Sequence, residues 1–272
     1  MHAPNQQMLW GGTAKVRRRA LLTAWSVAGA AVMRGADAAA PLRVGAALPD
    51  PPFELMAADG PAGFDVVLMQ RIAALLGRAW QLVPYTGADF NGIFAGLDAG
   101  TYDCIASGTT ITAEREQVAD FCAPYVVSGQ ALVVDVARHP QVHGTADLRG
   151  LVVGVQQGNT SQPVADRLVA EGRAGRVRVY PYDAIEKALD DLSSGGCDVF
   201  MKLGPVLEWF VRDRPRLKVV QTGITQERLA ICVRRGNSSL RESIDTAKAA
   251  LGKNGTLQAL ADEWLGKTAT AA

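Results

Sequence analysis

Residues 103–115 read DCIASGTTITAER, a short apolar run followed by a polar loop and a charged segment. The run at 103–106 suits a buried strand, whereas Gly108 and the hydroxyl side chains around it favour a loop. We predict a strand over 103–106 and a short charged helix over 113–118. A strand, a loop and a helix in this order form the unit of an α/β fold, whose ligands bind beyond the carboxyl ends of the strands. The loop at 107–112 is therefore a candidate ligand site.

The same alternation continues in both directions along the chain. Apolar residues at helical spacing or in short runs predict the elements, and Gly or Pro residues separate them. The pattern predicts α/β lobes with mainly parallel sheets, and the loops at 47–53, 107–112, 156–161 and 202–205 all follow strands. The other predicted strands are 42–47, 80–84, 151–155, 177–180, 198–201, 219–221 and 229–233, and the other predicted helices are 64–76, 93–97, 162–171, 184–192, 205–212 and two within 239–265.

The bulk composition is that of a packed protein. The chain has 272 residues, of which 48% are hydrophobic and 20% are charged, so its length suits two modest lobes or one large domain. The formal net charge is +1, which gives no electrostatic basis for binding nucleic acid.

The first 38 residues have the pattern of a signal peptide. A positive segment at 17–19 precedes an apolar run at 21–33, and the small residues Ala36 and Ala38 flank a cleavage position. The apolar run is too short for a stable membrane-spanning helix, which needs about 20 residues, although an N-terminal anchor is the alternative interpretation. We predict export to the periplasm by the general secretory or the twin-arginine route, with cleavage near Ala38.

The cysteines and histidines do not form a recognisable metal motif. An exported protein can keep disulfides, and Cys104 and Cys122 could meet, but buried thiols are equally consistent with their strand positions. The sequence also lacks a phosphate-binding loop, a GxSxG motif, an HExxH motif and a dinucleotide-binding glycine motif. We therefore expect no metal, no cofactor, no catalytic residues and no enzymatic activity. The other cysteines are Cys197 and Cys232, and the histidines are His2, His139 and His143.

Several short motifs, in order and spread over the mature chain, resemble the family 3 solute-binding proteins, which are polar amino-acid receptors of ABC importers. The resemblance implies a two-lobed periplasmic-binding-protein-like fold of type II, a monomer, and a membrane permease as partner. It places lobe 1 at 41–125 plus 230–272 and lobe 2 at 126–229, with hinge segments near 125–129 and 225–229. The matching segments are LRVG (42–45), PFE (52–54), GFDV (63–66), SGTTITAER (107–115), residues 120–129, GVQQG (154–158), residues 198–206, NGTL (254–257) and WLG (264–266).

The resemblance also assigns residues to the carboxylate of a ligand. Arg115 matches the family's carboxylate-binding arginine, and a guanidinium offers a planar fork of donors to two carboxylate oxygens. Ser107, Thr109 and Thr110 can offer hydroxyl and backbone donors to the same group. Taken without the resemblance, Arg115 also suits a solvated position beside two glutamates, and the hydroxyl residues also suit a turn or a helix cap.

Three further positions follow from the resemblance. Asn159 and Thr160 correspond to the turn of lobe 2 that offers backbone N–H groups to the carboxylate, and a helix that begins near Gln162 adds a favourable dipole. Phe90 corresponds to an aromatic wall of the ligand site, although a core position beside Ile93 is equally consistent. Phe53 matches a family position that we expect to pack in the core.

Two departures from the family pattern concern the ligand's α-ammonium group. The family usually has an acid two residues before Pro205, where this chain has Leu203, and a first-lobe acid is replaced by Ala47. A buried ammonium group without a carboxylate partner would be costly. Either Asp50 replaces the missing acid, or the ligand lacks the amine and Lys202 binds a further anionic group. Lys202 is also consistent with a surface lysine at the end of a strand.

The sequence therefore predicts a periplasmic receptor of an ABC importer that captures a small amino acid or an amine-free keto, hydroxy or aromatic acid. One alternative is a periplasmic enzyme on the same scaffold, similar to cyclohexadienyl dehydratase, with Asp50, Glu54 or Lys202 as the proton donor. A second alternative is an accessory protein that docks to a periplasmic oxidoreductase or sensor without needing a ligand.

Overall fold

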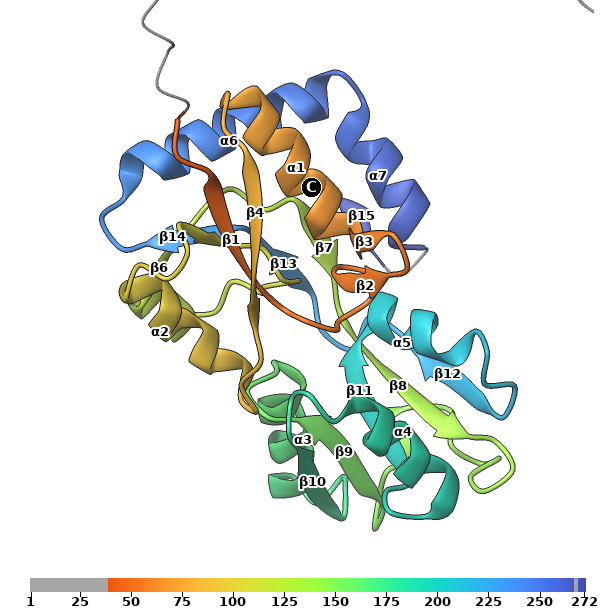
Figure 1. Cartoon of the computed structure of the whole chain (residues 1–272). Helices are drawn as coiled ribbons and strands as arrows, with labels where there is room; N and C mark the ends of the chain where they lie inside the picture. Colours follow the sequence, from red (N-terminus) through yellow and green to blue (C-terminus); the bar gives the residue numbers. More distant parts are fainter. Residues whose placement is uncertain (1–38, 267–268) are drawn as a thin grey trace, which may run out of the picture. The chain divides into compact units, whose positions relative to one another are not determined.

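The computed structural model of the chain describes residues 39–266 and 269–272. The predicted signal peptide, residues 1–38, lies outside the described residues. The described residues belong to one compact unit that contains two five-stranded sheets (Figure 1). The name lobe 1 refers to the first of these sheets together with the helices packed on it, and the name lobe 2 refers to the second sheet together with its helices.

The sheet of lobe 1 has the strand order β4-β1-β5-β14-β6. Only β14 runs against its neighbours, so the sheet is mainly parallel as predicted. The adjacent residues Cys104 and Ile105 belong to different core clusters, because successive side chains of a strand point to opposite faces. Helices α1, α6 and α7 cover one face and α2 covers the other. The bounds are β1 Leu42–Ala47, β4 Trp80–Tyr85, β5 Cys104–Ile105, β6 Ala119–Phe121, β14 Cys232–Arg234, α1 Phe64–Leu75, α2 Ile93–Asp98, α6 Ser238–Lys253 and α7 Thr256–Trp264.

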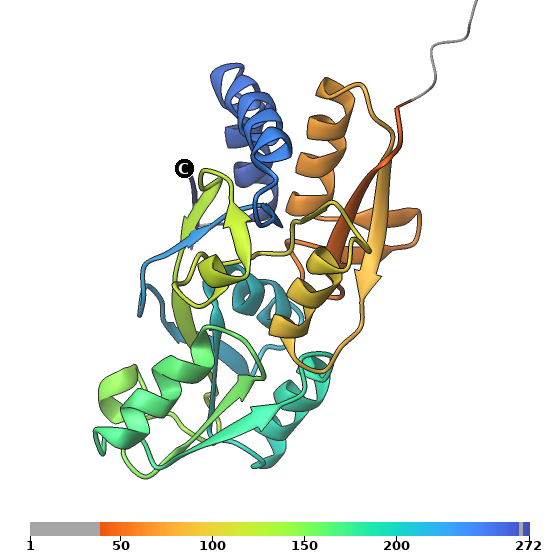
Figure 2. The same ribbon diagram turned by 90° about the vertical axis from the view of Figure 1, so that its left-hand side faces the viewer.

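The sheet of lobe 2 repeats this arrangement with the order β10-β9-β11-β8-β12, in which only β8 runs against its neighbours. Helix α3 covers one face, and α4 and α5 cover the other. Figure 2 shows α3 (green) at the opposite end of the molecule from α6 and α7 (blue). The bounds are β8 Gln130–Asp135, β9 Val152–Gln156, β10 Arg176–Tyr180, β11 Val199–Leu203, β12 Leu217–Gln221, α3 Ser161–Ala170, α4 Ile185–Ser194 and α5 Gly204–Val211.

A small three-stranded sheet lies where the chain passes between the lobes. Strand β7 (Val126–Ser128) pairs with β13 (Glu227–Leu229) and with β15 (Thr270–Ala271), both antiparallel. The two predicted hinge segments are thus neighbours, with Glu227 opposite Ser128. The residue boundaries of the two lobes stay a prediction.

The structure differs from the sequence prediction in a few local elements. The predicted helix over 113–118 is only a 3-10 turn, Arg115–Gln117, and the predicted strand over 229–233 is divided between β13 and β14. This division arises because Leu229 pairs with Val126 in the small sheet, whereas Cys232 pairs with Ile105 in lobe 1. Strands not predicted include β6, β7, β8 and β15, and the hairpin of β2 (Leu55–Ala57) and β3 (Gly60–Ala62).

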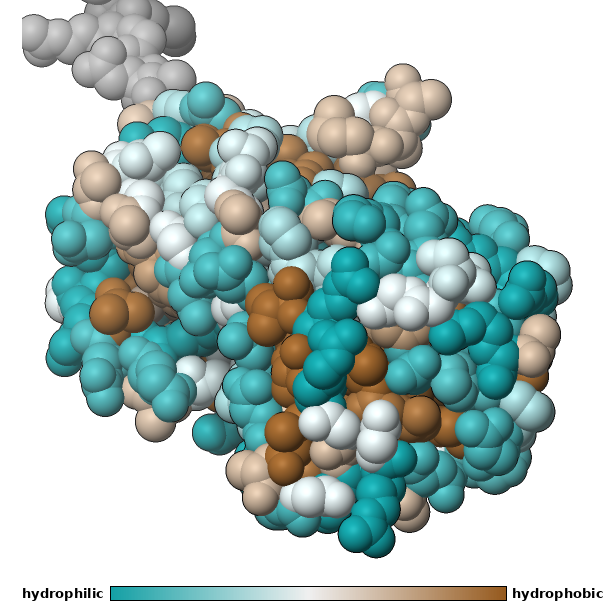
Figure 3. Space-filling model, turned by 90° about the horizontal axis from the view of Figure 1, so that it is seen from below, coloured by the Kyte–Doolittle hydropathy of each residue, from teal (hydrophilic) through white to brown (hydrophobic). Residues whose placement is uncertain are grey.

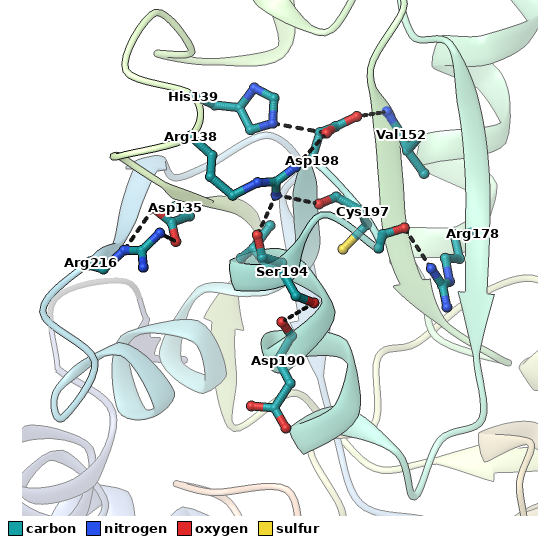
Figure 4. A network of polar contacts seen from close by, with 12 residues as sticks. Asp135, Arg138, His139, Val152, Arg178, Asp190, Ser194, Cys197, Asp198 and Arg216 are labelled. Atoms are coloured by element: carbon teal, nitrogen blue, oxygen red, sulfur yellow. Dashed lines mark hydrogen bonds and ion pairs between the residues drawn. The ribbon is translucent and has the colours of Figure 1, made fainter.

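A polar network holds the amino ends of β9 and β11 together (Figure 4). One oxygen of Asp198 accepts the backbone N–H of Val152 at 2.8 Å, and the other contacts His139 Nε2 at 2.9 Å and accepts from Arg138 at 3.4 Å. Arg138 also donates to the carbonyl of Cys197 at 3.0 Å. These are the opposite strand ends from the predicted ligand loops, so the part of the family motif at Asp198 stabilises the fold.

Gly129 joins β7 to β8 and has no room for a side chain. A Cβ atom there would lie 2.0 Å from the carbonyl oxygen of Thr225, a backbone atom that cannot turn aside. We expect Gly129→Ala to lower the free energy of unfolding by about 1–3 kcal/mol, because the two crossing segments must move apart. Gly252→Ala is the matched control: nothing lies near its Cβ within α6, and we expect it to stabilise by about 0.5–1 kcal/mol. Urea denaturation of both variants checks this, and an unchanged Gly129→Ala midpoint would contradict it.

Candidate functional site

A small cavity lies between the lobes at the carboxyl ends of the predicted strands. Its volume is about 20 Å³, enough for about one water molecule. Most of the predicted binding residues line it, whereas Thr109 does not: its hydroxyl donates to the carbonyl of Ser107 instead. The predicted residues that line the cavity are Asp50, Phe90, Ser107, Thr110, Arg115, Asn159, Thr160 and Lys202, and Gly108, Gln130 and Leu203 complete the lining.

A wider groove of about 900 Å³ adjoins this inner cavity. Lobe 1 contributes Phe94 and Glu114 to its wall, and lobe 2 contributes Pro163 near the amino end of α3. Arg115, Asn159 and Thr160 line both spaces, so the groove meets the inner cavity at the predicted carboxylate site.

Arg115 is buried at the boundary of the two lobes, with 6% of its surface exposed. Its guanidinium donates to the carbonyl of Thr110 in lobe 1 at 3.1 Å and to the carbonyl of Gly158 in lobe 2 at 3.0 Å. Its Nε donates to the amide oxygen of Asn91 at 3.2 Å, and its Cζ lies 4.8 Å from the centre of the Phe90 ring. Burial lowers the pKa of Arg115 from its ordinary value, and the charge of Glu227 opposes this effect.

Glu227 is the main residue of the site that the sequence analysis missed. Its carboxylate accepts from the hydroxyls of Thr110 and Thr160 at 2.7 and 2.8 Å. It also accepts from Gln130 Nε2 at 2.9 Å and from the Thr225 hydroxyl at 2.7 Å. The Thr110 hydroxyl, which was predicted for a ligand's carboxylate, is thus bound to a carboxylate of the chain itself, and so is the hydroxyl of Thr160. Glu227 lies on β13 and not in a loop after a strand, which is why the search of strand-end loops did not find it.

Asp50 and Lys202 form a buried ion pair across the two lobes, with Nζ 3.0 Å from Oδ1. Burial raises the pKa of Asp50, and the charge of Lys202 opposes that rise. The ammonium group of Lys202 also lies 5.2 Å from the ring centre of Tyr182, another residue that the sequence analysis missed. Lys202 is therefore not at the surface.

Ser107 is turned toward buried acids of lobe 1. Its hydroxyl donates to Glu54 at 2.5 Å and accepts from the backbone N–H of Ala47 at 3.0 Å. Burial, together with the charges of Asp65 and Asp50, raises the pKa of Glu54 well above its ordinary value. Ser107 thus holds the carboxyl group of Glu54 behind the cavity, and its hydroxyl hydrogen is already used in that bond.

Phe90 and Asn159 both line the inner cavity. Phe90 is 4% exposed and packs against Tyr182, with ring centres 5.2 Å apart, so it belongs to the core and also lines the cavity. The side chain of Asn159 donates to Gln156 at 3.4 Å. Phe53 is fully buried in the core of lobe 1, as expected.

The cavity is thus lined by the charged residues Arg115, Lys202 and Asp50, and the buried carboxylate of Glu227 lies directly behind its lining residues Thr110, Gln130 and Thr160. Residues 42–267 match the family described as bacterial extracellular solute-binding proteins, family 3. The chain belongs to this family. The membership confirms the family that the short motifs indicated, and it confirms the α/β, two-lobed fold class.

Individual relatives of this family 3 protein bind amino acids. The ABC transporter arginine-binding protein 1 of Escherichia coli (strain K12) is 30% identical over 85% of this chain and 93% of its own length. An ancestral arginine-binding protein, solved bound to arginine, has a TM-score of 0.75 and 34% identity over 83% of this chain and 98% of its own. The ancestral amino acid-binding protein AncCDT-1, a precursor of cyclohexadienyl dehydratase, has a TM-score of 0.73 and 28% identity over 83% of this chain and 95% of its own.

The family 3 chain also bears on the sequence predictions for the cysteines, for metal sites and for membrane-spanning segments. The four cysteines, Cys104, Cys122, Cys197 and Cys232, are buried free thiols, so Cys104 and Cys122 are not bridged. Within the part of the chain that the structure describes, no group of three or more His, Cys, Asp or Glu residues could hold a metal ion. No helix among residues 39–266 is long and apolar enough to cross a membrane.

Proposed function

We propose that this protein is the receptor of an ABC importer for a free α-amino acid, which it binds between the two lobes through its carboxylate. The observation that carries the proposal is the position of Arg115. The guanidinium is buried at the boundary of the lobes, holds a carbonyl of each lobe, and faces both the inner cavity and the outer groove. A buried guanidinium with free donors is suited to a carboxylate.

Binding requires the cleft to open beyond the state described above. Ligand pockets typically measure about 300–1,000 Å³, far more than the inner cavity. The paired hinge strands β7 and β13 are the natural place for such a motion, because few residues there need to change their backbone angles. A ligand that contacts both lobes would then favour closure.

The wider setting is part of the same proposal. The chain would be exported, act in the periplasm as a monomer, and deliver its ligand to a membrane permease. The exposed large apolar side chains of the described residues lie in separate parts of the chain: Met56 on β2, Leu75 at the end of α1, Val179 on β10, and Val118 and Val136 in the connecting segments after the 3-10 turn and β8. On the face shown in Figure 3, hydrophilic side chains separate the apolar patches. This distribution supports the monomer, because stable dimers need a continuous apolar surface.

We further propose that the protein binds its ligand without transforming it. Of the three proton donors considered from the sequence, Asp50 and Lys202 neutralise each other in a buried pair. Glu54 does not line the inner cavity, and its carboxyl oxygen already accepts from Ser107. A general acid must reach the substrate directly or through one water molecule.

A thermal-shift screen with the twenty standard L-amino acids tests the proposal. An amino acid at 100 times its dissociation constant adds about 2.7 kcal/mol to the free energy of unfolding, or roughly 5–10 °C to the melting temperature of a protein of this size.

We expect Arg115→Lys to lower the affinity for the amino acid that binds best roughly 10–100-fold, because a single ammonium group cannot replace the planar fork of donors. Arg173→Lys is the control, since Arg173 lies outside the cavity and the groove and forms an exposed ion pair with Glu171. Equal affinity of Arg115→Lys and wild type would refute this role, and turnover of a bound compound would favour the enzyme.

A further inference from the structure

Two buried charges at the cleft form no direct ion pair among the described residues: Arg115, which lines the cavity, and Glu227, which lies behind its threonines and acts on Arg115 only from a distance. Arg115 bonds only neutral oxygens in the described part of the chain, the carbonyls of Thr110 and Gly158 and the amide oxygen of Asn91. Glu227 accepts only from neutral donors there. By contrast, the charges of Asp50 and Lys202 compensate each other in a direct ion pair. A buried charge without a counter-charge is costly, so each of the two favours a ligand group of opposite sign.

Thr110 connects the two unpaired charges. Its carbonyl accepts from the guanidinium of Arg115 at 3.1 Å, and its hydroxyl donates to Oε2 of Glu227 at 2.7 Å. The positions for a negative and a positive ligand group therefore lie on two sides of one residue. The carboxylate and ammonium groups of an α-amino acid are attached to one carbon atom, which matches this close arrangement.

The two oxygens of Glu227 have different partners, and this difference permits an exchange. Oε1 is held by Gln130 and Thr225, neither of which the resemblance assigns to a ligand. Oε2 accepts from the hydroxyl of Thr110, which is predicted to bind the ligand's carboxylate, and from the hydroxyl of Thr160, which lies in the turn predicted to offer backbone N–H groups to that carboxylate. When these two hydroxyls rotate toward a bound carboxylate, Oε2 is released to accept from the neighbouring ammonium group, while Oε1 keeps Glu227 in place.

The geometry points to Glu227 as the specificity residue that binds the ligand's α-ammonium group, in place of the acid that Leu203 replaces. This assignment rests on the proposed amino-acid-binding function. It does not use Asp50, because that carboxylate already has Lys202 as its counter-ion. It also reverses the sequence-based interpretation that the ligand lacks an amine, since the missing acid is supplied from the hinge strand β13 and not from the end of β11.

The test compares an amino acid with its amine-free counterpart on wild type and Glu227→Gln. Dissociation constants are measured by calorimetry for the L-amino acid that binds best in the screen, beginning with L-arginine, and for the matched 2-hydroxy acid. We expect wild type to prefer the amino acid and Glu227→Gln to lose roughly 10–100-fold in its affinity, with the 2-hydroxy acid changed much less. Retained binding of the 2-hydroxy acid also proves that the variant is folded.

Glu263→Gln is the matched control, because Glu263 is exposed on α7, outside the cavity and the groove. If wild type binds the amino acid and Glu227→Gln keeps the same preference, the role of Glu227 is wrong while the proposed function stands. If wild type prefers the 2-hydroxy acid, the inference is overturned and an amine-free ligand is supported. If no amino acid of the screen binds wild type, the proposed function itself fails.

Discussion

Replacing Lys202 by methionine is expected to lower the free energy of unfolding by about 3–5 kcal/mol, because Asp50 would stay buried without its counter-ion. Both side chains of the pair are almost fully buried, at 3% and 7% exposure. Methionine keeps the length and the apolar stem of lysine, so the charge is the main change. Since burial already raises the pKa of Asp50, protonation of this carboxyl should recover part of the loss at low pH.

The double variant Asp50→Leu with Lys202→Met separates the charge from the packing. Apolar residues of similar volume can replace a buried pair at little cost, so we expect the double variant to be much closer to wild type than Lys202→Met alone. Lys187→Met is the control, because the exposed i,i+4 pair of Lys187 with Asp191 should cost less than about 1 kcal/mol. Urea denaturation at neutral pH measures all four proteins. If Lys202→Met lost less than about 1 kcal/mol in its free energy of unfolding, the charge of Lys202 would not be needed to compensate the buried charge of Asp50.

The sequence predicted most of the framework because its helices and strands carry their own patterns. Helix α1 was expected at 64–76 and is found at Phe64–Leu75, since its apolar residues repeat at helical spacing. Strand β8 was missed although QALVVD is buried along its whole length. Such a continuous apolar run on a doubly covered sheet lacks the alternation that identifies a half-buried strand. The predicted helix at 113–118 became a 3-10 turn of three residues, and isolated short helices are marginal without packing.

The candidate site was predicted less completely, because its contacts join distant parts of the chain. Asp50 and Lys202 were both singled out, but as alternatives, one for an ammonium group and one for an anion. Their pairing depends on how the two lobes face each other, which no local pattern records. Glu227 reaches Thr110 and Thr160 only because β13 pairs with β7. Arg115 and Thr110 were assigned from the resemblance of the motif at 107–115 to the family, which is contiguous in the sequence, and both residues line the inner cavity.

The stability of the protein is expected to fall as the pH rises from about 4 to about 7, and Asp65 is one of the buried carboxyl groups responsible. Asp65 lies in the first turn of α1 and is 1% exposed. Burial raises its pKa from 3.8 to about 7, although hydrogen bonds to one oxygen from the backbone N–H of Gly108 at 2.6 Å and the hydroxyl of Tyr125 at 2.9 Å act in the opposite direction. The folded protein therefore holds a proton that the unfolded chain releases at lower pH.

The sign of the pH effect follows from this difference in bound protons. Below the unfolded pKa both states are protonated, and the stabilisation from the neutral carboxyl is fully present. Above that pKa the unfolded chain binds fewer protons, so the free energy of unfolding falls until the folded carboxyl also ionises near pH 7. A shift of this size corresponds to about 4 kcal/mol for the single group. Buried Glu54, whose pKa is also raised by burial, acts in the same direction.

Asp65→Asn should remove the part of this slope that Asp65 contributes, because the amide keeps an acceptor for Gly108 and Tyr125 but cannot ionise. Denaturation between pH 4 and pH 8 should show wild type losing stability relative to the variant as the pH rises. Asp103→Asn is a control of opposite sign. Burial raises the pKa of Asp103, but its bonds and charge contacts with Arg43, and the charge of Arg78, outweigh this and lower it. Stability from Asp103 is therefore lost only as the pH falls toward and below 3.8, so Asp103→Asn should change in parallel with wild type over most of the range from pH 4 to pH 8. If the free energies of unfolding of Asp65→Asn and wild type change in parallel across this range, Asp65 is ionised in the folded protein throughout. The prediction that the buried Asp65 carboxyl is neutral would then be wrong.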